Sequence, residues 1–398
     1  MRKTIENIQW GLFCTSSWTW CIGMYLPFIL LRLWGWPGFW AFFVPNVLGC
    51  AMFGFVLDAR RSRALSARLG WACALFSAVT VAYQCWFAGW IAQSVLAGPG
   101  TGAGADRTSN ESAEAASLAL RTVVSTGVPI ALLLAGTMLA FRGNAFWRTA
   151  GTLVTIASGL LALLPGGPFA IDSATAAGSA PSSTVTPLLG TLPLAFAFPT
   201  IAAGFLLSPY LDLTFHRAAQ EAPNPRVAFA TFGVTFGAML LLVASFFDPS
   251  TGSPAITPAL LALWAVQLLF TISVHLRELL TAAPGIRIPA AATGALVAAG
   301  VLLATPAFLF TIGAGLLPGE PLYLTFLGAY GLLFPVLFLL ERRPASRSVT
   351  VGILLLGIPC YLLGAWDFMT FLMPVPIALA LWAARRPSGA IPSAIPAP

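Results

Sequence analysis

The sequence predicts an all-α protein that crosses a membrane about twelve times, and two observations carry this prediction. Hydrophobic residues make up 58% of the chain and charged residues only 8%, whereas an ordinary soluble domain carries about 25% charged residues. The apolar residues also fall into runs long enough for a helix to cross the hydrocarbon core of a bilayer. Twelve such spans lie at 9–32, 36–57, 69–96, 121–141, 149–165, 188–208, 227–246, 257–275, 288–316, 321–340, 348–366 and 368–384.

The basic residues between these spans predict how the chain is oriented. Cytoplasmic loops of membrane proteins carry an excess of Lys and Arg. Here 17 of the 20 basic residues fall at the two termini or in every second loop, and the remaining three are Arg32, Arg107 and Arg121. We therefore expect both termini to lie in the cytoplasm. The preference for Arg over Lys, with much Ala, Gly and Pro, is typical of a GC-rich bacterial genome and so indicates a bacterial inner membrane.

The chain offers few groups for catalysis or for cofactor binding. Its six cysteines all lie inside apolar runs without metal-ligand spacing, which is typical of small buried side chains. Its two histidines, His216 and His275, stand at helix ends. We expect no enzyme activity and no cofactor. The expected partners are the lipid bilayer and a small solute, with no nucleic acid and no protein partner that the sequence identifies.

Two long loops, at 97–116 and 166–187, are rich in Gly, Ala, Ser and Thr. Such composition is typical of flexible linkers, and the alternation of basic loops places both outside the cell.

The sixth span is the one around which we expect the site to form. It contains Pro199 and Gly204, meets Pro209 at its end, and runs into a charged cluster formed by Asp212, His216 and Arg217. A proline frees a backbone carbonyl and a glycine lets the helix bend. Inside a bilayer, a broken helix is tolerated only where it is packed in protein or lines a wet cavity. We predict a break near 199–204 that serves in gating; the alternative is a helix bent only for packing.

The first span carries a second set of break signals. Ser17 and Trp20 precede Gly23, and Pro27 follows one turn later. Small hydroxyl side chains beside a glycine and a proline can line a cavity, although they also suit a face that packs against another helix. We predict a break near Gly23, close to the break of the sixth span and at the middle of the membrane.

A possible wall for the solute combines aromatic and amide side chains. Tyr83 and Gln84 lie near the middle of the third span, and Phe196, Phe198 and Thr200 lie in the sixth span. Together with Trp20 they offer flat faces and one amide but no charge. This favours a neutral or zwitterionic solute, held by stacking and by free backbone groups. The alternative is that Gln84 only bridges two helices.

The layout resembles the LeuT-type fold of the amino acid–polyamine–cation superfamily. The stretch SSWTWCIGMYLP with PNVLGCAMFG is similar to the opening helices of sodium–solute symporters, and the segment from Pro209 to Arg217 resembles the stretch after the sixth helix of nucleobase–cation symporters. The resemblance implies two inverted five-helix repeats, at 9–165 and 188–340, plus two further helices at 348–384. It implies a secondary active transporter that works by alternating access.

The predicted coupling ion is sodium. Proton-driven carriers generally place a titrating group inside the membrane, whereas here Asp212 lies at a span end with Arg217 near enough to hold it ionised. Carbonyls freed in the first helix could hold Na⁺, and the resemblance implies that Thr271 and Ser273 add hydroxyl ligands.

Two other classes of protein remain open on the sequence. The segment from Gly54 to Arg63 approximates the loop between the second and third helices of the major facilitator superfamily, which also has twelve spans. A sensory or structural membrane protein, or a membrane transferase using Asp212 and His216, is the other alternative.

Overall fold

The computed structural model describes residues 1–97, 111–163, 187–281, 288–306, 319–340, 346–366 and 370–385. About 89% of these residues are helical. The predicted loop at 166–187 lies almost wholly outside the described residues, and so do residues 98–110 of the other predicted loop and 307–316 of the predicted ninth span. Residues 111–116, predicted as part of the loop at 97–116, are helical instead.

The helices of the N-terminal half are α1 (Arg2–Trp18), α2 (Cys21–Ala51), α3 (Phe53–Val56), α4 (Ala59–Arg68), α5 (Gly70–Ala97), α6 (Glu111–Ala140) and α7 (Asn144–Leu161). Those of the C-terminal half are α8 (Pro187–Leu207), the 3₁₀ turn η1 (Ser208–Leu211), α9 (Leu213–Glu221), α10 (Pro225–Ala244), α11 (Pro258–Thr281), α12 (Ala290–Leu303), α14 (Glu320–Gly328), the π turn η3 (Ala329–Leu333), α15 (Phe334–Leu340), α16 (Ser346–Trp366), the 3₁₀ turn η4 (Thr370–Leu372) and α17 (Pro374–Arg385). The strands β1 (Phe247–Asp248) and β2 (Ser253–Pro254) form a short antiparallel hairpin.

Eight helical segments within the described part of the chain are long and apolar enough to cross a membrane. They start in α2, α5, α6, α8, α10, α11, α14 and α16. Two shorter apolar helices lie at Ala290–Leu303 and Thr370–Arg385. The chain is therefore an all-α, multi-pass membrane protein.

A turn inside α2 separates the first predicted span from the second. Gly35 has φ +60° and ψ −154°, so the helical conformation is interrupted there. Side chains with a Cβ rarely adopt that conformation, which is the reason for glycine at this position. Gly38 sits inside the same turn, where a Cβ atom would lie 2.9 Å from the Leu30 carbonyl oxygen. The chain therefore reverses direction within a few residues.

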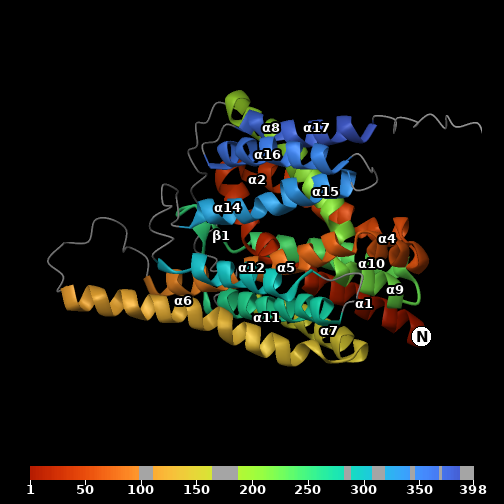
Figure 1. The fold of residues 1–398 in the computed structure, drawn as a ribbon. Coiled ribbons are helices and arrows are strands. Elements are labelled where there is room, and N and C mark those ends of the chain that lie inside the picture. The colour runs from red at the N-terminus through yellow and green to blue at the C-terminus, as the bar shows by residue number, and fades with distance from the viewer. Residues whose placement is uncertain are drawn as a thin grey trace, which may run out of the picture.

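The long helices run side by side in one bundle (Figure 1). The start of α1 lies with α4 and α9 at one end, which we call the N-terminal end, and α14 and β1 lie toward the opposite end (Figure 1). The core of the bundle is aromatic: Trp10, Trp86, Trp264 and Tyr323 are all less than 2% exposed. In contrast, α6 presents exposed apolar side chains such as Leu134 and Met138, which suits a face toward lipid.

The break in the first span lies before the predicted position. Helix α1 ends at Trp18, Trp20 is extended, and α2 begins at Cys21, so Gly23 is inside a helix. The Thr19 hydroxyl donates to the Thr15 carbonyl, and the Trp20 indole donates to the Ser17 carbonyl. Such side-chain bonds to the preceding turn compete with the helix ladder. Gly23 packs against Leu240, which would be in ordinary van der Waals contact with a Cβ at this position, at 3.4 Å.

The break in the sixth span lies after the predicted position. Helix α8 continues through Pro199 and Gly204 and ends at Leu207, where η1 begins. Pro209 starts the 3₁₀ turn, and Asp212 is the extended residue that caps α9. Gly204 serves packing, because a Cβ there would lie 3.0 Å from the Tyr330 carbonyl oxygen. The predicted break at 199–204 is therefore wrong in position.

A third irregularity follows α14. Residues Ala329–Leu333 form one π turn between α14 and α15. Pro335, the second residue of α15, lacks an N–H and carries a bulky ring, and so opens the hydrogen-bond ladder four residues earlier, inside the π turn. Isolated π turns are frequent at functional sites.

Candidate functional site

The three irregular segments meet inside the bundle, and we call residues 17–20, 208–214 and 329–333 the junction. The Thr214 hydroxyl donates to the Ser17 hydroxyl at 3.1 Å, which joins the two helix breaks. The Trp18 and Phe215 rings lie 4.8 Å apart between centroids. The Ser208 hydroxyl donates to the Tyr330 carbonyl at 2.9 Å, and the Tyr330 ring lies 4.9 Å from that of Trp20. Breaks far apart in the sequence therefore form one hydrogen-bonded centre.

Side chains from other helices bond backbone carbonyls on both sides of the first break. The Thr271 hydroxyl of α11 reaches the Ser16 carbonyl at 3.4 Å. The Tyr323 hydroxyl of α14 donates to the Cys21 carbonyl at 3.0 Å. Buried backbone carbonyls need such partners, so this break is held open by the surrounding helices.

Asp212 is the carboxylate of the junction and is fully buried. One oxygen, Oδ1, accepts a 2.7 Å hydrogen bond from the Thr214 backbone N–H, as an N-cap residue does. The other oxygen, Oδ2, accepts no hydrogen bond from the described residues. Burial raises the pKa of this carboxyl to about 7, against the lowering effect of the Thr214 hydrogen bonds, and the nearby Glu278 raises it further.

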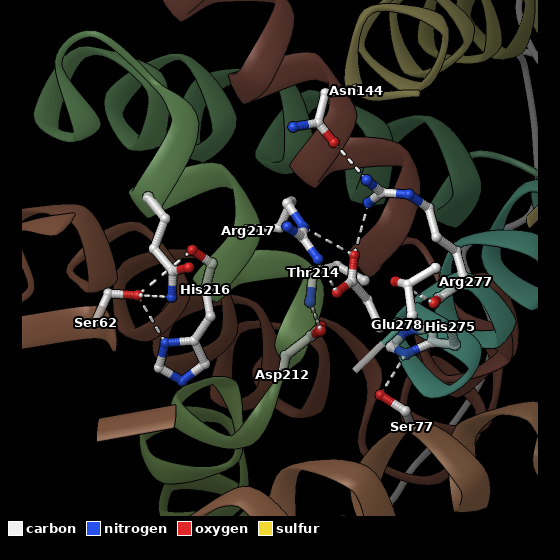
Figure 2. A network of polar contacts seen from close by, with 12 residues as sticks. Ser62, Ser77, Asn144, Asp212, Thr214, His216, Arg217, His275, Arg277 and Glu278 are labelled. Carbon is white, nitrogen blue, oxygen red and sulfur yellow. Dashed lines mark hydrogen bonds and ion pairs between the residues drawn. The ribbon is translucent and has the colours of Figure 1, made fainter. Parts of the chain in front are cut away.

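A cluster of ion pairs lies beside Asp212, between α9 and α11 (Figure 2). Arg217 holds both carboxylate oxygens of Glu278, at 2.8 and 3.2 Å. Arg277 binds the same carboxylate at 2.8 Å and also donates to Asn144 at the start of α7. The expectation that Arg217 pairs with Asp212 is therefore wrong. Arg217 lies on α9 and faces α11, whereas Asp212 caps the start of α9.

His216 points away from this cluster, toward α4 (Figure 2). Its Nδ1 bonds the Ser62 hydroxyl at 2.8 Å, and its Nε2 bonds the Tyr210 carbonyl at 3.0 Å. A carbonyl oxygen only accepts, so Nε2 carries the proton and Nδ1 accepts from Ser62. Burial lowers the pKa of His216 to about 4. The imidazole is therefore neutral and serves to attach α9 to α4.

A cavity of about 400 Å³ opens between α2, α8, α14 and α16, which is the size of a small-molecule site. Its wall is mostly apolar, with Leu26, Ile201 and Leu327 among its residues. Arg32 and Glu320 line it and pair with each other across α2 and α14. Tyr330 and Gly204 also line it, so the cavity reaches the junction.

The structure brings only some of the predicted solute wall together. Trp20 and Tyr83 both lie within 6.2 Å of the Tyr330 ring, and Thr200 lines the cavity while donating to the Met373 carbonyl at 2.7 Å. Phe196 and Phe198, each 43% exposed, are on the surface of α8.

Gln84 is fully buried, and neither atom of its amide is hydrogen-bonded within the described residues. It is not among the residues that line the cavity.

The two residues predicted for sodium point to different neighbours. Thr271 bonds the Ser16 carbonyl of α1, whereas the Ser273 hydroxyl bonds its own helix at Leu269 and lies against Gly136 of α6. Residues two apart on a helix face opposite sides, so the two hydroxyls do not converge. Among the described residues, no group of three His, Cys, Asp or Glu side chains is placed to hold a metal ion.

Sequence reasoning missed Tyr330, Glu278 and the Arg32–Glu320 pair. Pro335 was the available signal for the π turn that carries Tyr330. Arg32 and Glu320 were visible as the charges at the ends of two predicted spans, but nothing in the sequence pairs them.

Comparison of the chain with protein-family models, with curated proteins and with solved structures finds no match.

Proposed function

We propose that this protein is a secondary transporter that moves a small neutral or zwitterionic solute across the inner membrane by alternating access. The observation that carries the proposal is the junction: two broken helices meet beside a cavity of about 400 Å³. Broken helices deep in a membrane protein are where transporters bind their solutes. Interrupting a helix costs free energy, and such irregular backbone is concentrated at functional sites. Three interruptions at one place therefore favour a functional role.

The pattern of helix packing supports a repeat of five helices, as in the LeuT-type fold. If α1 with the first part of α2 is the first span, α1 packs against α10, the seventh span, and α8, the sixth, packs against α2, which contains the second. In the same way α11, the eighth, packs on α6, the fourth, and α5, the third, packs on α12, the ninth. Numbered by span, these pairs are 1–7 and 6–2, and 4–8 and 9–3. Exchanging spans 1–5 with spans 6–10 turns the first pair of each set into the second, as two equivalent repeats require.

The proposed topology has twelve spans with both termini in the cytoplasm. The eight apolar segments supply most of them, and the shorter α7, α12 and α17, with α1, complete the set. The exposed arginines of α4 lie at the N-terminal end of the bundle (Figure 1), which is the end that the positive-inside rule assigns to the cytoplasm. Arg32 and Glu320 then lie toward the outside.

The cavity supports the proposed class of solute. Its wall is mostly apolar, and among the described residues that line it only the Arg32–Glu320 pair is charged. Because the two charges neutralise each other, the cavity offers no net charge to an ionic solute. A neutral molecule with an apolar body fits this wall, and so does a zwitterion whose charges face the ion pair.

The binding site is tested by filling the cavity. Purified protein is screened by thermal shift against amino acids, nucleobases and sugars, and the screen is repeated on Thr200→Trp. We expect a solute that stabilises the wild type and not Thr200→Trp. The matched control is Thr137→Trp, on the exposed face of α6, which keeps the shift. An equal thermal shift in Thr200→Trp would show that the solute does not bind in the cavity.

A further inference from the structure

Asp212 combines three properties that a purely structural N-cap does not need. It is fully buried, one of its carboxylate oxygens has no partner among the described residues, and it lies where the break of the sixth span touches the break of the first. An N-cap needs only one acceptor oxygen, and here Oδ1 fills that role with the Thr214 N–H. An Asn or Ser side chain would cap the helix without bringing a buried acid into the bundle.

The cations nearest to Asp212 in the sequence and in space have other partners. Arg217 and Arg277 both bind Glu278 (Figure 2). His216 is neutral, because its Nε2–H donates a hydrogen bond to the Tyr210 carbonyl and its Nδ1 accepts one from the Ser62 hydroxyl. Among the described residues, an ionised Asp212 would therefore be a buried charge without a counter-ion, which is costly in a low-dielectric interior.

The other groups that surround Asp212 do not supply positive charge either. Thiols and one phenol face it from α1, α2, α5 and the π turn, and a carboxylate faces it from α11. The buried parts of α8, α10 and α15 carry no titratable side chain, and the arginines of α4 and Arg226 of α10 are exposed. The thiols of Cys14, Cys50 and Cys73 and the Tyr330 phenol are uncharged near neutral pH, and the Glu278 carboxylate is paired with Arg217 and Arg277.

We propose that Asp212 is the proton-binding site of this protein and that it couples solute movement to a proton gradient. This proposal rests on the proposed transport function. With the junction closed at the N-terminal end, Oδ2 carries a proton taken from water on the opposite side of the membrane, toward which Arg32 and Glu320 lie. When the α9–α11 ion pairs open and water enters from the N-terminal end, the carboxyl is solvated, and the same proton leaves to water. Binding and release of one proton thus accompany closing and opening of the junction.

This assignment replaces sodium as the expected coupling ion. The sodium expectation depended on an Asp212 kept ionised by Arg217, and Arg217 binds Glu278 instead. It also depended on Thr271 and Ser273 facing one site, whereas they contact α1 and α6 respectively. One unpartnered carboxylate oxygen is enough to bind a proton, whereas a cation requires several oxygens around one point.

Protonation of the Asp212 carboxyl is tested directly by an infrared titration of purified protein in nanodiscs. The carbonyl stretch of a protonated carboxyl is recorded between pH 5 and pH 9 for wild type, Asp212→Asn and Asp58→Asn. Asp58 is the matched control, because it is also a helix N-cap but is exposed. We expect a band that disappears with a midpoint near neutral pH in wild type and Asp58→Asn, and no such band in Asp212→Asn. A band that persists in Asp212→Asn, or a wild type without one, overturns the proposal.

The same titration in sodium chloride and in choline chloride separates the two ions. A proton site gives equal midpoints in both salts. A midpoint that falls in sodium chloride alone would mean that sodium competes for the carboxylate, and this result would overturn the proposal in favour of a sodium site.

Coupling is then measured in proteoliposomes with the solute that the thermal-shift screen selects. We expect an inward proton gradient to drive accumulation in wild type and in Asp58→Asn. Asp212→Asn loses accumulation but still exchanges labelled for unlabelled solute. Gradient-driven accumulation by Asp212→Asn overturns the coupling role. A titrating Asp212 in a protein that moves no solute would instead refute only the transport function.

Discussion

Arg217 binds Glu278 across the α9–α11 contact and does not bind Asp212, five residues earlier in its own chain. This pair joins the segment after the sixth span to the eighth span, on the N-terminal side of the junction. In the proposed mechanism this pair closes the junction from that side, and it leaves Asp212 without a counter-ion among the described residues.

Removal of this pair should destabilise the protein. Glu278 is 5% exposed and keeps only Arg277 as a cationic partner in Arg217→Ala. We expect the free energy of unfolding to fall by about 1–3 kcal/mol, the cost of weakening a buried charged hydrogen bond. Arg61→Ala, which breaks the exposed pair with Asp58, should change nothing measurable. Denaturation in micelles measures both. Equal stability of Arg217→Ala and wild type would contradict the role of the pair.

The same variant should open the junction to thiol reagents. Cys14, Cys50 and Cys73 are buried, and among the described residues only Cys360 is partly exposed. We expect a maleimide to label Cys360 alone in wild type, and additionally Cys14 or Cys50 in Arg217→Ala, because water enters when α9 separates from α11. Mass spectrometry of the labelled peptides gives the result. An unchanged labelling pattern would show that the ion pairs do not close the junction.

The buried amide of Gln84 should lower the free energy of unfolding. Its amide is fully buried, and neither polar atom has a partner in the described structure. Gln84→Leu should therefore raise the free energy of unfolding by about 1–3 kcal/mol, since an unbonded buried amide costs that much. The control is Gln93→Leu, which loses a 2.7 Å bond to the Ala304 carbonyl and should destabilise. If Gln84→Leu also destabilises, the amide has a partner that the protein needs.

Gly204 should tolerate no side chain. A Cβ there would lie 3.0 Å from the Tyr330 carbonyl oxygen, so Gly204→Ala would push α8 away from the π turn. Overpacking of this kind costs about 1–3 kcal/mol. Gly127 of α6 has no such neighbour, and Gly127→Ala should stabilise by up to about 1 kcal/mol through helix propensity. Unfolding of the two variants in parallel provides the comparison, and a stabilised Gly204→Ala would contradict the packing described here.

Asp212 also predicts a pH dependence of stability. Burial raises its folded-state pKa to about 7, above the ordinary aspartate value of 3.8, so the folded state binds more protons between these values. The contribution of Asp212 to stability is then complete below about pH 4 and decreases as pH rises to about 7. The wild type minus Asp212→Asn difference in unfolding free energy should fall across that window, and a difference that is flat with pH would contradict the assignment.

The positions of the apolar spans could be predicted because hydropathy and arginine placement act along the chain. The break positions could not, because glycine serves two purposes. Gly23 and Gly204 resemble hinge residues in the sequence, yet both lie inside helices, and Gly204 makes room for the π turn. The real breaks depend on Trp20 and Asp212, whose side chains bond the local backbone.

The partners of the buried polar side chains could not be predicted from the sequence either. Arg217 stands close to Asp212 in sequence, so a local pair was the natural expectation, whereas Glu278 is brought near only by the packing of α9 on α11. Tyr330 likewise reaches the junction because Ser208 bonds its carbonyl. Contacts between distant segments follow from the tertiary structure, which one sequence does not contain.

The central claim is that the junction and its cavity move a solute, and uptake into proteoliposomes tests this most directly. The solute that stabilises wild type but not Thr200→Trp is labelled, and its entry is followed over time. The account predicts saturable uptake by wild type and by Thr137→Trp, and none by Thr200→Trp. Uptake no faster than in protein-free liposomes, for every solute that binds, would contradict it.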